Sequence, residues 1–146
     1  MKLKLAIFAA ALLACALLVP AAAVAAGPLD AIKADAAKIE ADVRAARDAI
    51  VADANKIVAD ASHAASRETI RADLHQLRSD LRAAHRTLHA DRHQLRADLK
   101  AARDAHVSRD DVKSILEGLR AHVRPLLQEI GSALEAARDA LKSLKH

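Results

Sequence analysis

The sequence predicts an all-α protein, an elongated antiparallel bundle of three long helices. Apolar residues recur at spacings that hold them on one face of a helix, and this regularity is interrupted twice, near residues 62–67 and 107–109. We therefore expect helices near residues 29–61, 67–106 and 109–145. At the α-helical rise each would be roughly 50–60 Å long, and short connections make neighbouring helices antiparallel.

A four-residue pattern supports the helical prediction. Ile or Leu, any residue, Ala or Ser, and then Asp occur in this order eight times between residues 32 and 98, at steps of 7, 11, 7, 13, 7, 11 and 7 residues. A step of 7 and a step of 11 together span 18 residues, which is five helical turns. The 7-residue step shifts the apolar stripe around the helix in the left-handed sense, and the 11-residue step shifts it back in the right-handed sense. We therefore predict long, fairly straight helices built from a duplicated 18-residue unit.

Residues 1–26 have the pattern of a secretory signal peptide. Lys2 and Lys4 precede an apolar run of about 15 residues, shorter than the ~20 of a membrane span, and small residues suitable for cleavage follow. We expect an exported, periplasmic or extracellular protein whose residues 27–146 form a single helical domain. The alternative is lipoprotein anchoring at Cys15, because Leu12–Cys15 loosely resembles a lipobox.

The two interruptions carry helix-start signals. The 13-residue step falls at residues 57–70, where Ser66 can cap a new helix. Ser108, with Asp111 three residues later, resembles a capping box. Beyond it the apolar face keeps its phase across Pro125, which predicts one helix there and not two. An alternative to the bundle is a rod in which the first two helices continue as one and dimerise.

The middle helix has three distinct faces. We expect Ile70, Leu74, Leu77, Leu81, Leu88, Leu95 and Leu99 to form a buried stripe. Aspartates line one border of this stripe, and we expect them to form a solvated flank. The other border and the back carry a basic face, a candidate surface for a polyanion or another partner, made of Arg71, Arg78, Arg82, Arg86, Arg96, Lys100 and Arg103.

Like charges four residues apart oppose helix formation, and Arg78, Arg82 and Arg86 have this spacing. An anionic partner would relieve the repulsion, and so would acidic residues of another helix. Residues 28–61 carry seven acidic and five basic side chains. An anionic partner, neutralisation by the first helix and a plain solvated basic face therefore all stay open at this point.

Histidines give a second candidate site. His85, His89 and His93 are spaced so that adjacent members can meet on the helix surface. Such a pair, with a third ligand from a neighbouring helix, can bind Zn²⁺, Cu²⁺ or Ni²⁺. The surrounding arginines repel cations, so the alternative is an ordinary polar face.

The composition excludes several function classes. The three glycines are far apart, which argues against a phosphate-binding loop or a nucleophile elbow. Residues 27–146 contain no Trp, Tyr or Phe, which argues against nucleic-acid binding by base stacking. We expect a non-catalytic protein with a structural or chaperone-like interaction role, without sequence-specific nucleic-acid binding or a transmembrane segment. The alternative is a metal-binding or metal-buffering protein.

An alanine-rich apolar stripe buries little area, so we also expect self-association. If Leu77 and Leu81 occupy core positions of a parallel coiled coil, Asp80 of one chain faces Arg78 of another. An antiparallel partner with the same pattern would bring aspartate against aspartate. We therefore predict a homodimer, or a larger assembly, through the middle helix.

Overall fold

The computed structural model describes residues 27–144 of the chain. The predicted signal peptide and Cys15 lie outside the described residues, as do residues 145–146. Every regular element in the described part is an α-helix, which confirms the all-α prediction, and each predicted boundary is correct to within two residues. The helices are α1 (Pro28–Ser62), α2 (Arg67–Asp104) and α3 (Arg109–Ser143).

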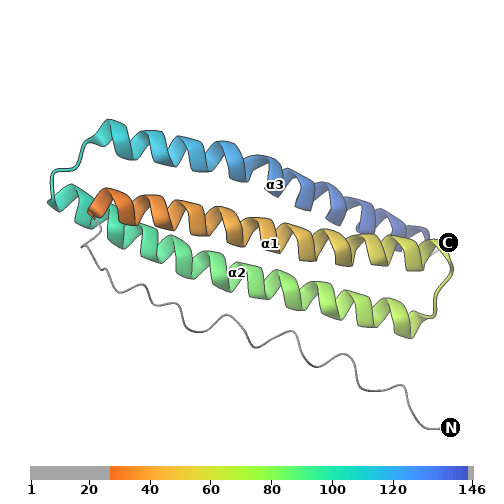
Figure 1. The fold of residues 1–146 in the computed structure, drawn as a ribbon. Helices are drawn as coiled ribbons and strands as arrows, with labels where there is room; N and C mark the ends of the chain where they lie inside the picture. Colours follow the sequence, from red (N-terminus) through yellow and green to blue (C-terminus); the bar gives the residue numbers. More distant parts are fainter. Residues whose placement is uncertain (1–26, 145–146) are drawn as a thin grey trace, which may run out of the picture.

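The three helices fold back on one another side by side (Figure 1). α1 packs against both α2 and α3, whereas the backbones of α2 and α3 do not approach each other within residues 27–144. The chain turns between α1 and α2, so the alternative of one continuous rod is wrong. α1 is therefore the central helix of a three-helix bundle, and each outer helix has a face that no other helix covers.

Both predicted helix starts are confirmed. The Thr69 backbone N–H donates to the Ser66 hydroxyl at 3.1 Å, and the Asp111 N–H donates to the Ser108 hydroxyl at 3.4 Å. Each cap satisfies an N–H group that has no partner inside its helix. α3 continues as one helix through Pro125, as predicted.

The two connections close in the same way. Ala64 and His106 both adopt the left-handed conformation, with φ of 52° and 56°. The residue after each donates its N–H back into the preceding helix, at 2.9 Å in the first turn and 3.0 Å in the second. This arrangement satisfies carbonyl groups at the helix C-terminus and reverses the chain within a few residues. The short connections set the antiparallel order.

The hydrophobic core follows α1. α1 contributes eight buried residues, because it is covered on two sides. Of the predicted stripe of α2, Ile70 and Leu77 are buried and the other five residues are half-buried. Four of these five pack against core clusters that α1 shares with α3. One core cluster has Ile50, Ala54 and Ile57 at its centre, together with Leu77 of α2 and Ala137 of α3.

The residues of the predicted dimer seam are used within one chain. Leu77 is buried in the core and Leu81 packs against the same cluster, while the Asp80 carboxyl faces Asp53 of α1. A dimer through this stripe would require α1 to be displaced. Self-association through the middle helix would thus have to use residues of α2 outside this stripe, and it stays a prediction that light scattering at low salt would test.

Candidate functional site

The basic face predicted on α2 is displayed on the outside of the bundle. Its seven residues, named above from Arg71 to Arg103, are all exposed. They share one helix because their spacing repeats with the apolar stripe, which turns the opposite face toward α1. None of the seven forms an ion pair with any residue between 27 and 144. The repulsion within this face is therefore not relieved inside the described chain.

The acidic residues of α1 are engaged elsewhere. Glu40 accepts hydrogen bonds from Arg44 at 2.7 Å and interacts with the His122 ring of α3 at 3.0 Å. The remaining acidic residues of α1 interact with lysines or arginine of α1 itself or with aspartates of α2. None of these acidic residues pairs with the basic face in the described chain, so an anionic partner and a plain solvated face are the explanations that stay open.

Aspartates and lysines gather where α1 and α2 meet, in two clusters that we call the carboxylate seam. The clusters are related by the 18-residue repeat, which runs in opposite directions along the two antiparallel helices, so each cluster has four aspartates and one lysine in the same arrangement. The first consists of Asp35, Lys38, Asp42, Asp91 and Asp98, and the second of Asp53, Lys56, Asp60, Asp73 and Asp80.

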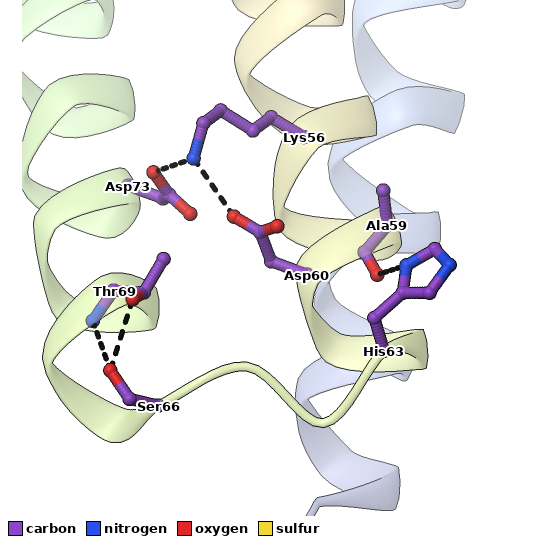
Figure 2. Close-up of polar contacts among 7 residues, drawn as sticks. All are labelled: Lys56, Ala59, Asp60, His63, Ser66, Thr69 and Asp73. Atoms are coloured by element: carbon purple, nitrogen blue, oxygen red, sulfur yellow. Dashed lines mark hydrogen bonds and ion pairs between the residues drawn. The ribbon is translucent and has the colours of Figure 1, made fainter.

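Each cluster has one lysine that bridges the two helices. Figure 2 shows Lys56 of α1 between Asp60 of its own helix, at 2.8 Å, and Asp73 of α2. Lys38 bridges Asp42, at 2.8 Å, and Asp91 in the same way. Asp73 and Asp91 are only 8% and 6% exposed. The expectation of a solvated aspartate flank is therefore wrong for these two residues, since α1 covers the border on which they lie.

Each cluster also has a pair of facing carboxyl groups. Burial, a hydrogen bond to Asp98 and the negative charges of Asp98 and Asp91 raise the pKa of Asp35 above its ordinary value. Burial, with Asp80 and Asp73 in the corresponding roles, raises the pKa of Asp53. A hydrogen bond between two carboxyl groups requires a proton on one of them. This is the aspartate-to-aspartate contact that the sequence predicts for an antiparallel partner.

The lysines shift their neighbours in the opposite direction. The hydrogen bond from Lys38 lowers the pKa of Asp42, and the hydrogen bond from Lys56 lowers the pKa of Asp60. Four carboxylate oxygens, one each from Asp35, Asp53, Asp73 and Asp91, are buried without a hydrogen-bond partner in the described part of the chain. Proton uptake at the facing pairs therefore relieves a cost that the lysines do not remove.

The seam between α1 and α3 has a different chemistry. Arg47 of α1 lies 3.3 Å from Glu129 of α3, and His122 of α3 approaches Glu40 of α1. The hydrogen bond with His122 lowers the pKa of Glu40. Charges on this side are complementary, so negative charge is concentrated between α1 and α2, close to the basic face of α2.

The histidines of the candidate metal site lie on the exposed side of α2. His85, His89 and His93 are all exposed, and the rings of His85 and His89 stack with centroids 6.4 Å apart. No neighbouring helix supplies a third ligand: among residues 27–144, no three His, Cys, Asp or Glu side chains are grouped as a metal site. The structure thus brings two of the three predicted histidines together.

Sequence reasoning did not identify the bridging lysines. Lys38 and Lys56 are 18 residues apart, and each precedes an Asp at the fourth following position. This spacing could have indicated the two clusters. The aspartates of α2 that pair with these lysines could be identified only after the two helices were placed antiparallel.

Comparison of the chain with protein-family models, with curated proteins and with solved structures finds no match. A separate search of the helices in the described region finds no apolar stretch long enough to cross a membrane. The geometry above therefore supplies the basis for a functional proposal.

Proposed function

We propose that the protein is a non-catalytic interaction protein of the cell envelope that presents the basic face of α2 to an extended anionic partner. The observation that supports the proposal is the exposure of seven basic side chains, without ion pairs in the described chain, along one helix. Release of counterions from a linear or planar polyanion would favour binding to such a face.

The geometry fits a partner that is long or flat. α2 has 38 residues, which corresponds to roughly 57 Å of helix. Its basic residues recur along most of this length, so a small anion would contact only one or two of them. Placement in the cell envelope rests on the signal-peptide pattern of residues 1–26, and fractionation of cells that express the full chain tests it.

The polyanion experiment uses heparin, a linear sulfated polysaccharide, as the probe. Calorimetry compares the unmodified chain with the double variant Arg82→Ala/Arg96→Ala. The matched control is Arg124→Ala/Arg138→Ala, which removes the same charge from exposed positions of α3. We expect the α2 variant to weaken binding about tenfold and the α3 variant to change it less than twofold. Equal losses in both variants would contradict a role for α2 in particular.

A second candidate function is metal binding at the middle helix, supported by the stacked rings of His85 and His89. Two imidazoles four residues apart on a helix can share a Zn²⁺, Cu²⁺ or Ni²⁺ ion. Titration calorimetry with each ion at neutral pH tests this function, with His75→Ala/His106→Ala as the control for His85→Ala/His89→Ala. Binding no tighter than about millimolar, or equal loss in both variants, would rule it out.

A further inference from the structure

A groove opens at the end of the bundle where α2 connects to α3. Its volume is about 930 Å³, and α2, α3 and the turn between them form its walls. α1 contributes no residue to the lining. The volume lies within the range of small-molecule binding sites, which is about 300–1,000 Å³.

Five of the eleven lining residues are apolar. Ala102 is buried and the other four are half-buried. The lining contains no aromatic residue, which favours a flexible aliphatic ligand over a planar ring. The apolar lining residues are Leu99, Ala102, Val107, Val112 and Leu116.

The rim of the groove is basic. Arg103 comes from the last turn of α2, whereas Arg109, Lys113 and Arg120 come from α3, and the His106 ring lies in the turn. The single acidic lining residue is Glu117, which lies 3.8 Å from Lys113 in an exposed contact. Positive charge therefore exceeds negative charge around an apolar floor.

We propose that this groove binds an anionic amphiphile, a single alkyl chain that ends in a carboxylate, sulfate or phosphate group. The alkyl chain would lie on the apolar floor, and the head group would contact the arginines and the lysine of the rim. This inference is independent of the polyanion function, because the groove and the basic face of α2 share only one residue, Arg103.

The experiment uses the full chain and the fluorescent probe 11-(dansylamino)undecanoic acid, whose emission rises in an apolar site. The chain contains no Trp or Tyr, so the protein contributes little background. We expect binding that hexadecanoate displaces, while hexadecanol and inorganic phosphate displace the probe at least tenfold less well. For shorter acids, each added methylene should tighten binding by roughly two- to fourfold.

The test variant is Arg109→Ala/Lys113→Ala, since both residues are exposed and their only ion pair in the described chain is the exposed contact of Lys113 with Glu117. We expect it to weaken probe binding at least fivefold. The matched control is Arg82→Ala/Arg96→Ala, which lies outside the groove and should change probe binding less than twofold. The control variant is also the one expected to weaken heparin binding. Failure of the amphiphile proposal is therefore distinguishable from failure of the polyanion proposal.

Several results would overturn the amphiphile site. Absence of displacement by hexadecanoate excludes an alkyl-binding groove. Equal displacement by inorganic phosphate indicates an anion site without an apolar component, and equal displacement by hexadecanol indicates no role for the rim. Tighter displacement by an acidic amphipathic peptide would reassign the groove to a protein partner. Equal weakening of probe binding by the two double variants would show that the probe responds only to the net charge of the protein.

Discussion

Aspartates at equivalent places in the repeated pattern have two different environments along the carboxylate seam. Asp53 on α1 faces the Asp80 carboxyl, whereas Asp73 on α2 faces the Lys56 ammonium. The difference arises because each residue meets the antiparallel helix at a different point of its repeat. The same local sequence therefore produces a repulsive contact in one place and an attractive contact in the other.

The facing carboxyl pairs predict a pH-dependent stability. Because the pKa values of Asp35 and Asp53 are raised in the folded state, their contribution to stability is fully present below the ordinary aspartate pKa of 3.8. It is lost as the pH rises through the raised folded values. The double variant Asp35→Asn/Asp53→Asn should therefore be more stable than the unmodified chain at pH 7, by roughly 0.2–1 kcal/mol for each site.

Urea unfolding followed by circular dichroism, at pH 7 and below the ordinary aspartate pKa of 3.8, measures this effect. The stability difference between variant and unmodified chain should shrink at the lower pH, as the carboxyl pairs take up protons. Asp104→Asn, at an exposed position of α2, serves as the control and should have no pH-dependent effect. A variant that is less stable at pH 7, or a difference independent of pH, would contradict the facing-carboxyl arrangement.

The bridging lysines make a second prediction at the residue scale. Lys56→Ala removes the cation that lies against the buried Asp73 carboxylate, so the folded state should lose more stability than with a lysine whose partner is exposed. Lys33→Ala removes an exposed pair with Asp30 at 3.6 Å and should cost at most about 0.5 kcal/mol. Urea unfolding at neutral pH compares the two variants. Similar losses would show that Asp73 does not depend on the bridge.

At the scale of the helices, the sequence predicted what depends on local interactions. The helix starts were predictable because Ser66 and Ser108 cap their own helices, and the exposure of the basic face followed from its spacing. The burial of Asp73 and Asp91 was not predictable, because it depends on which face of α1 packs against α2. The groove was not predictable either, since it results from the separation of α2 and α3.

The basic face should lower the stability of its own helix. Arg82 lies four residues from both Arg78 and Arg86, and like charges at this spacing destabilise a helix. Arg82→Ala removes both repulsions and introduces a strong helix former, so we expect a gain of about 0.5–1 kcal/mol. Thermal unfolding at low and high salt measures it, and the gain should shrink as salt screens the repulsion. A loss of stability at low salt would show that Arg82 makes a stabilising contact.

The whole molecule separates its charges across α2. Carboxylates are concentrated between α1 and α2, while the basic residues of α2 lie on its exposed side. Like charges four residues apart on this exposed side oppose the helix that carries them. The proposed partner surface therefore coincides with the part of α2 where the described chain offers no neutralising charge.

The salt dependence of heparin binding tests the central claim most directly. The logarithm of the binding constant is measured against the logarithm of salt concentration for the unmodified chain and both double variants. If the basic face of α2 contacts the polyanion, Arg82→Ala/Arg96→Ala should reduce the magnitude of the slope by about two, roughly one for each lost contact. Arg124→Ala/Arg138→Ala should leave the slope unchanged. The same slope in all three proteins, or a loss confined to the α3 variant, would contradict the claim.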